Sequence, residues 1–306
     1  MAQQKLAWQS KLVLLAVVPF AGTGAALGLL GWPAQSAPVI VWTAGLSALL
    51  GLVTWKLRAA TPGAALTGTA ITASLMFSTI SFPYEPWHTG LIPILAVSVL
   101  AFAATRVGRR KKERLGTAER RRGRSASQVA ANLGIAALVL CEPIQLWVID
   151  RGWLNRTWLN RTWLDQDWPN RATSTPPALF AVALAALAEA AADTVSSEIG
   201  QVLGGRPRMI TTLRKAEPGT DGAVTIAGSI AGVLAGAAIA AVGTWALNGD
   251  GRMFLLSSAG AVFGLFFDSL LGATLENFGW LNNDAVNFLS TAAAAAFAVV
   301  GLLVLR

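Results

Sequence analysis

Histidine and cysteine are nearly missing from this 306-residue chain, which contains one of each, His88 and Cys141. A single cysteine cannot form a disulfide within the chain or build a cysteine metal cluster. A single histidine excludes a multi-histidine metal site and leaves little place for histidine acid–base catalysis. Charged residues are also scarce, at 13% of the sequence, whereas hydrophobic residues make up 54%. These proportions exclude an ordinary soluble domain.

Long apolar runs fill most of the chain, and many reach the roughly 18 to 20 residues that a helix needs to cross a bilayer. We therefore expect an all-α fold, a polytopic membrane helix bundle in which residues 1–306 form one integral membrane domain. The first run is longer than the apolar part of a secretory signal, so we interpret it as a retained helix. About nine spans are expected, at 11–31, 38–55, 63–82, 88–105, 126–148, 176–200, 222–246, 253–275 and 286–305.

The basic residues predict the orientation of these spans. With the N-terminus in the cytoplasm, 18 of the 24 Lys and Arg residues fall in inner segments, and the C-terminus lies outside. Such a bias is the positive-inside signal of membrane proteins. The net charge of +8 is thus interpreted as a topology signal, and no nucleic-acid partner is expected. We expect a multi-pass protein of the cell membrane, in contact with membrane lipids.

Two connecting segments have unusual compositions. Residues 106–124 contain ten basic residues. They could anchor the topology beside anionic lipid, or they could form a phosphate-attracting rim on a site that opens inward. The second segment repeats tryptophan every five residues from Trp153 to Trp168. Tryptophan is common at membrane interfaces, so we interpret this repeat as an interfacial outer loop without chemistry.

Several carboxylates lie inside or at the edge of the apolar runs, where a charge is costly and usually faces a cavity or a partner. Glu189 and Asp193 are four residues apart, and thus share one helix face. In the expected topology the acidic residues of three spans converge on the inner side, which requires a divalent cation, basic side chains or shared protons as counter-charge. The converging residues are Asp193, Glu198, Asp268, Glu276 and Asp284.

The loop after 176–200 has the chemistry of a phosphate site, because Arg and Lys bind phosphate oxygens and a capped helix start presents N–H groups to an anion. A plain inner loop rich in positive charge is the alternative interpretation. No GxxxxGK[ST] phosphate loop occurs in the chain. Carboxylates beside phosphate-binding basic groups are typical of phosphoryl transfer. The loop residues concerned are Arg206, Arg208, Thr211, Thr212, Arg214, Lys215, Gly219 and Thr220.

Three asparagines stand near the inner ends of the expected spans. They are Asn132, Asn283 and Asn287. Amides in hydrocarbon commonly hydrogen-bond between helices, and they can equally line a polar site. Glycines at a spacing of four in "GSIAGVLAGAAIAA" predict close packing between two helices.

The motifs "ADTVSSEIG", "PRMITTLRKAEPGTDGAVTIAG", "DSLLGATLEN" and "NNDAVNFLST" resemble a broad family of integral membrane proteins. That family includes the plastid phytyl-phosphate kinase of vitamin E synthesis and the human transmembrane protein nineteen. The resemblance covers roughly residues 60–305. It implies that a nucleoside triphosphate, with CTP expected, phosphorylates an isoprenyl monophosphate to the diphosphate. "DTVSSEIG" followed by "EPGT" is also similar to the motif order of dolichol kinases.

The leading hypothesis is therefore a kinase of isoprenyl monophosphates such as phytyl or geranylgeranyl phosphate, with Mg²⁺ as cofactor. Asp193, Glu198 and Asp268 are the expected catalytic residues. The first two would hold Mg²⁺, with Asp268 and Asp284 as further ligands or nucleotide contacts. The expected substrate and phosphate contacts are Arg106, Asn132, Arg206, Arg208, Thr211, Thr212, Arg214, Lys215, Gly219, Thr220, Asn283 and Asn287.

Two alternatives remain at this stage. One is another CTP-using prenyl-lipid enzyme, such as a kinase of the free alcohol or a cytidylyltransferase. The other is a secondary transporter, because intramembrane carboxylates also carry protons and ions. A transporter needs polar residues through the full depth of the membrane, whereas a kinase needs a pocket on one side. The role of Glu189, which lies deeper than the other acids, is left open.

Overall fold

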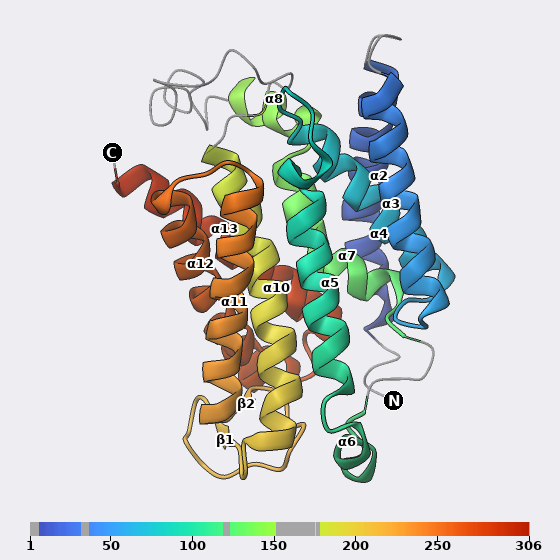
Figure 1. Ribbon diagram of the computed structural model, residues 1–306. Helices are drawn as coiled ribbons and strands as arrows, with labels where there is room; N and C mark the ends of the chain where they lie inside the picture. Colours follow the sequence, from blue (N-terminus) through green and yellow to red (C-terminus); the bar gives the residue numbers. More distant parts are fainter. Residues whose placement is uncertain (1–5, 32–36, 119–122, 151–174, 176–177, 306) are drawn as a thin grey trace.

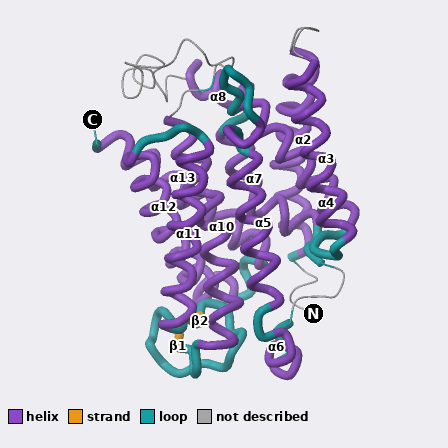
Figure 2. Tube along the Cα trace, in the orientation of Figure 1, coloured by secondary structure: helices purple, strands orange, loops and turns teal. Residues whose placement is uncertain are grey.

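The computed structural model describes residues 6–31, 37–118, 123–150, 175 and 178–305 (Figure 1). Most of these residues are helical, the others lie in loops and turns, and β1 and β2 are the two short strands described (Figure 2). The tryptophan repeat lies outside the described residues. The elements are α2 Ala7–Gly31, α3 Ala37–Lys56, α4 Pro62–Ser78, η2 Pro86–His88, α5 Leu91–Arg106, α6 Arg109–Leu115, α7 Ala126–Val139, α8 Glu142–Asp150, α10 Ala178–Leu203, β1 Arg208–Met209, β2 Ala223–Val224, α11 Ile226–Ala246, α12 Gly251–Leu271, η4 Gly272–Glu276 and α13 Asn283–Val304.

The membrane helix bundle is confirmed, but the expectation of nine spans is too high. Among the described residues, six helices are long and apolar enough to cross a membrane: α2, α3, α10, α11, α12 with η4, and α13. A seventh span results if α5 and α6, which meet at a 64° bend, are counted together. Segment 63–82 forms only the 17-residue α4. Segment 126–148 is broken after the 14-residue α7, at a turn that a hydropathy average does not detect.

Helix α10 is the centre of the bundle, since 94% of its apolar window is buried. It packs against α5, α7, α11, α12 and α13. Its sequence explains this position, because alanine occurs on every face and lets neighbouring helices approach from all sides. In contrast, only 17% of the corresponding window of α2 and 22% of that of α3 are buried. The other helices therefore enclose α10 as far as Ala192, whereas Asp193 and Glu198 near its end are partly buried.

Close contact between α10 and α11 depends on glycine, as the spacing of four predicted. A Cβ atom at Gly232 would lie 2.7 Å from the carbonyl oxygen of Ala192, and one at Gly228 would lie 2.6 Å from that of Ser196. Both distances are far below van der Waals contact, so a larger residue would force the helices apart. The glycines thus hold α11 tightly against the part of α10 that bears Asp193.

Polar caps fix the helix starts at one end of the bundle. Ser125 and Gln128 form a capping box at α7, and Asn282 accepts a hydrogen bond from the backbone of Ala285 at α13. Thr225 caps α11 in the same way. A side-chain cap satisfies N–H groups that have no partner within the helix. These caps set where the polar ends of the helices lie.

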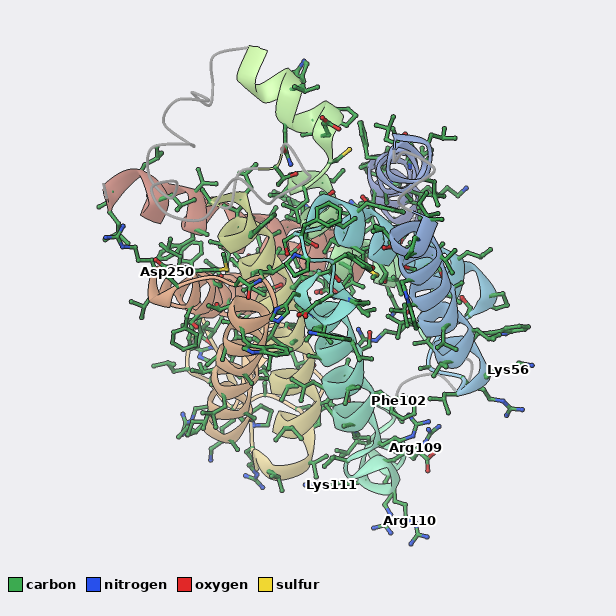
Figure 3. All side chains as sticks on the ribbon, turned by 45° about the horizontal axis from the view of Figure 1, so that its top comes forward. Lys56, Phe102, Arg109, Arg110, Lys111 and Asp250 are labelled. Carbon is green, nitrogen blue, oxygen red and sulfur yellow. The ribbon has the colours of Figure 1, made fainter. Side chains whose placement is uncertain are left out.

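We call this end of the bundle the basic end. It contains α6, the β1–β2 hairpin, the last turn of α10 and the starts of α11 and α13 (Figure 1). Lys111 ties α6 to it by donating to the carbonyl of Val202. Arg109, Arg110 and Lys111 lie together there, whereas Asp250 lies at the opposite end (Figure 3). The positive-inside bias predicts that the basic end faces the cytoplasm.

Candidate functional site

A polar cavity of about 390 Å³ opens at the basic end. Its volume lies within the usual range of small-molecule sites. Six parts of the chain meet around it: the segment after α6, the start of α7, the end of α10, the loop that leads into α11, the end of α12 with η4, and the start of α13. The polar lining includes Thr117, Arg124, Gln128, Asn132, Asp193, Thr194, Ser196, Ser197, Glu198, Gln201, Thr220, Asp221, Thr225, Asp268, Ser269, Glu276, Asn283 and Asn287.

Asp193 on α10 and Asp268 on α12 are neighbours in this cavity, and their carboxylates interact directly. The Asp268 Oδ2 atom is buried and has no hydrogen-bond partner among the described residues. Arg124 supplies positive charge to Asp193, and its guanidinium donates to the Thr194 hydroxyl at 3.3 Å. Adjacent carboxylates repel each other, so the pair favours a cation that contacts both. The sequence correctly predicted that these two acids converge.

Glu198 has a basic partner that the sequence analysis did not identify. Lys112, which is only 1% exposed, forms an ion pair with Glu198. The same Lys112 ammonium donates to the carbonyls of Ala104 and Thr105, both at 3.0 Å. The ammonium group therefore has three acceptors, as a buried charge requires. The sequence left open whether a cation, a basic side chain or a shared proton neutralises these acids, and for Glu198 the structure shows a basic side chain.

A π-helical turn, η4, forms one wall of the cavity and carries Glu276. Turns of this type inside helices are frequent at functional sites. Gly222 lies against the turn with φ at +73°, and a Cβ atom there would be 2.1 Å from the backbone nitrogen of Ala273. Only glycine combines this left-handed conformation with so close an approach. Asp221 directly precedes Gly222 in the chain, and burial raises the pKa of its carboxyl group.

The asparagines turn out to combine both roles that the sequence left open. The Asn287 amide donates to the Asn132 side-chain oxygen at 3.2 Å and so joins α13 to α7. Asn132 in turn donates to the carbonyl of Gln128 at 2.9 Å. Both asparagines, together with Asn283, also line the cavity. The hydrogen bonds between helices thus hold amide groups at the edge of the site.

The loop 204–225 folds back on itself through the β1–β2 hairpin, in which Arg208 pairs with Val224. Of its predicted phosphate contacts, Gly219 and Thr220 line the cavity. The other six are exposed on the loop and are absent from the lining, and Arg208 donates to the carbonyl of Leu213 at 2.8 Å. Their assignment as phosphate contacts stays a prediction. These six are Arg206, Arg208, Thr211, Thr212, Arg214 and Lys215.

Three further residues lie away from the cavity lining. Asp284 lies in the first turn of α13, and its carboxylate accepts a hydrogen bond from the Ser10 hydroxyl at 2.6 Å. Arg106 stacks on the ring of Phe102, 3.3 Å from its centroid. Glu189 is buried beyond Asp268, at 1% exposure, and its Oε1 has no hydrogen-bond partner among the described residues. The proposed metal role of Asp284 also stays a prediction.

Arg124 and Lys112 are two basic residues at the site that the sequence did not single out. Both belong to the basic segment 106–124, where composition alone cannot separate an inward-facing side chain from a solvated one. A signal did exist for Arg124, since it directly precedes the Ser125 cap of α7 and must enter the bundle with that helix. Lys112 offered no such signal, because four other basic residues surround it between Arg109 and Arg114.

Comparison with known proteins places the chain among membrane proteins. The model of the family described as "Integral membrane protein DUF92" matches residues 45–295. The uncharacterized membrane protein sll0875 of Synechocystis is 31% identical over 220 residues, which cover 69% of this chain and 72% of that protein. No solved structure matches the chain significantly.

Two further relatives match with different coverage. The uncharacterized membrane protein MJ0933 of Methanocaldococcus jannaschii is 41% identical over 121 residues, or 40% of this chain and 49% of that protein. The chain therefore spans about half of that relative. Protein VTE6, chloroplastic, of Arabidopsis thaliana is 26% identical over 242 residues, which cover 77% of this chain and 65% of the plant protein.

Proposed function

Because this chain belongs to the integral membrane family DUF92, we propose that it is a membrane-bound kinase that phosphorylates an isoprenyl monophosphate to the diphosphate. The observation that carries the proposal is the polar cavity at the basic end, with paired carboxylates, an arginine and a glycine-rich turn around one space. The similarity to a chloroplastic plant protein agrees with the plastid enzyme that the sequence motifs resemble. A nucleoside triphosphate, with CTP as first candidate, is the proposed donor.

The proposed reaction forms one bond and breaks one. An oxygen of the lipid phosphate attacks the γ-phosphorus of the nucleotide, and the bond from that phosphorus to the β–γ bridging oxygen breaks. The products are the lipid diphosphate and a nucleoside diphosphate. A phosphate monoester is largely dianionic at neutral pH, so no base has to remove a proton. Catalysis then depends on positioning and charge neutralisation, which suits a chain with a single histidine.

Asp193 and Asp268 are the residues proposed to hold Mg²⁺. The unpartnered Oδ2 atom of Asp268 beside the Asp193 carboxylate fits such an ion. No group of three His, Cys, Asp or Glu residues suited to a metal ion occurs in the described part of the chain. Mg²⁺ commonly binds one or two carboxylates and takes its other ligands from phosphates and water. When bound, the ion would neutralise phosphate charge in the transferring group.

The chain's own residues would orient the two substrates. Arg124 lies beside Asp193, where its guanidinium can bind phosphate oxygens in a bidentate manner. The turn at Gly219 and Thr220 faces the same space and is suited to the nucleotide phosphates. The cavity and its polar lining lie at the basic end. This one-sidedness supports an enzyme over a transporter, which requires polar groups through the full membrane depth.

The test uses the purified full chain in lipid nanodiscs, with CTP, Mg²⁺ and phytyl or geranylgeranyl monophosphate, and follows diphosphate formation. Asp193→Asn and Asp268→Asn should each lower turnover at least about 100-fold, a common effect of losing one preorganised electrostatic group. Asp250→Asn is the matched control, because it caps α12 at the opposite end and asparagine caps equally well. Wild-type protein that turns over no prenyl phosphate with any nucleotide would refute the kinase proposal.

A further inference from the structure

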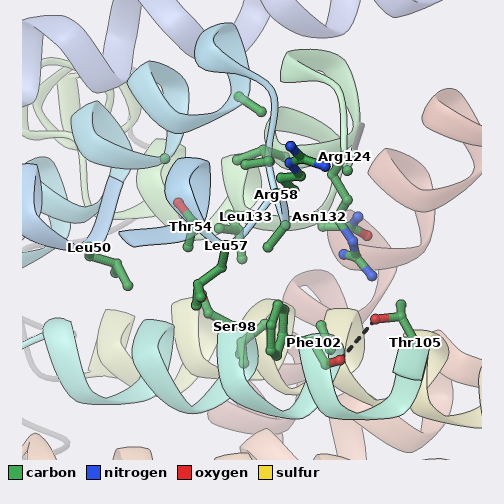
Figure 4. Close-up of a pocket in the computed structure, with 18 of the residues that line it drawn as sticks. Leu50, Thr54, Leu57, Arg58, Ser98, Phe102, Thr105, Arg124, Asn132 and Leu133 are labelled. Carbon is green, nitrogen blue, oxygen red and sulfur yellow. Dashed lines mark hydrogen bonds between the residues drawn. The ribbon is translucent and has the colours of Figure 1, made fainter. Parts of the chain in front are cut away.

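A second cavity, of about 320 Å³, lies beside the polar one and is mostly apolar. We call it the apolar groove. Figure 4 shows that Leu50, Thr54 and Leu57, from α3 and the turn after it, face Ser98 and Phe102 of α5 across this space. Helices α4 and α7 complete its walls. The apolar side chains along this space are suited to a hydrocarbon chain.

Positive charge gathers at one end of the apolar groove. Arg58, Arg106, Arg109 and Arg124 all line it there. The Phe102 ring lies under the Arg106 guanidinium, which holds that side chain at the groove by a cation–π contact. Arg109 also pairs with Glu113 at the surface. A molecule that fits both parts must combine an apolar chain with an anionic head.

The two cavities share a wall made of Arg124 and Asn132, since both residues line each of them. Arg124 also interacts with Asp193, so the basic end of the groove leads to the paired carboxylates. An anionic head bound at Arg124 would therefore stand between the groove and the polar cavity. This arrangement separates a lipid substrate from a water-soluble one, while their reacting groups meet at a single arginine.

We propose that the apolar groove binds the hydrocarbon tail of the acceptor lipid, with its phosphate held by Arg124 and Arg106 at the mouth of the polar cavity. This inference rests on the proposed function and specifies the class of its substrate. The groove runs along α5 from Ile94 to Arg106, about 18 Å at 1.5 Å per residue. An extended tail of about fourteen carbon–carbon bonds fills that length, because a zigzag chain of bonds about 1.5 Å long advances about 1.25 Å per bond.

Ser98 offers a way to shorten the groove. It lies eight residues before Arg106 on α5, or about 12 Å along the helix, which matches about ten carbon–carbon bonds of an extended chain. Ser98→Phe should therefore obstruct tails longer than that and leave a geranyl tail, with its eight-carbon main chain, nearly unaffected. Val99→Phe is the matched control, because Val99 is adjacent, 56% exposed and outside the groove lining.

The experiment measures kcat/KM for geranyl, farnesyl, geranylgeranyl and phytyl monophosphates with wild type, Ser98→Phe and Val99→Phe. We expect Ser98→Phe to lose at least tenfold with the two longest tails and less than threefold with geranyl, while Val99→Phe behaves as wild type. Equal losses for all tails, or none, would overturn the groove assignment. Either result leaves the kinase proposal intact, because wild-type turnover is measured alongside.

A second readout does not depend on turnover. A photoreactive geranylgeranyl monophosphate should crosslink to α5 in wild type and Val99→Phe, and at least tenfold less in Ser98→Phe. Excess unlabelled geranylgeranyl monophosphate should compete, whereas inorganic phosphate and a phosphatidylcholine vesicle should not. Competition by the vesicle would show that the groove holds ordinary bilayer lipid and would overturn the proposal. If wild type crosslinks at α5 but phosphorylates nothing, the proposed function fails and the groove assignment stands.

Discussion

The ion pair between Lys112 and Glu198 yields a prediction about stability. Lys112→Met removes the ammonium group and retains most of the side-chain volume. Glu198, which is 14% exposed, then lies in the interior without this partner, close to Asp193. The carbonyls of Ala104 and Thr105 lose a donor as well. The variant should therefore be strongly destabilised.

The magnitude follows from the burial of the pair. Removing one partner of a buried ion pair costs about 3–5 kcal/mol, because the remaining charge stays desolvated. Replacing both partners by apolar residues is often neutral, since both desolvation costs then disappear. We thus expect about 3–5 kcal/mol for Lys112→Met, and a much smaller loss for the double variant Lys112→Met/Glu198→Met. Lys111→Met, at an exposed neighbouring position, should cost less than about 1 kcal/mol.

The assay is reversible unfolding in mixed detergent micelles with increasing SDS, completed as a double-mutant cycle. The coupling energy between the two positions reports the pair itself, apart from the separate effects of each substitution. A loss below about 1 kcal/mol for Lys112→Met would refute the reasoning, since it would mean that the pair is effectively solvated. Single effects that simply add in the double variant would refute it as well.

Two further predictions concern the polar loop and the helix contact. Burial raises the pKa of Asp221 above its ordinary 3.8, so the stability of the fold should fall as pH rises from 3.8 through the native pKa. Asp221→Asn should remove this decline, which thermal unfolding measured across that pH window would show. Wild type and variant with the same pH profile would contradict it. Gly232→Val should separate α11 from α10 and cost about 1–3 kcal/mol, whereas Gly45→Val on α3, which meets nothing within 4 Å, should be neutral in the same measurement. Equal losses of stability in the two glycine variants would show that the contact between α10 and α11 does not require a glycine at position 232.

The sequence predicted those site residues whose type is energetically unfavourable in their local surroundings. Asp193 and Asp268 stand out because a carboxylate in an apolar run must face a cavity or partner, and the structure brings both to one cavity. Asn132, Asn287, Gly219 and Thr220 were predicted to belong there for related reasons, and they too line it. Residues whose type is unusual for their surroundings are therefore the ones that sequence reasoning locates.

The direction in which a side chain points and the length of a helix were not predictable in the same way. A basic residue is ordinary in a segment between two spans whether it points inward, as Lys112 does, or outward, as Arg214 does, so composition cannot separate the two cases. The span count was too high because hydropathy averages across the turn that ends α7. The apolar groove left no pattern at all, since the side chains that suit a lipid tail also suit the bilayer and the protein core.

The enclosure of α10 has a consequence for how the protein is made. Its neighbours α5 and α7 are synthesised before it, but α11, α12 and α13 are synthesised after it. When α10 first enters the membrane, the faces that these later helices will cover must contact lipid or the insertion machinery, with Asp193 and Glu189 among their residues. Ribosome-bound chains in which α10 has entered the membrane and α11 has not should therefore expose these faces of α10 to crosslinking with lipid or the insertion machinery. The site can be assembled only after the last helix is in place, so a truncation far from any reacting group would abolish it.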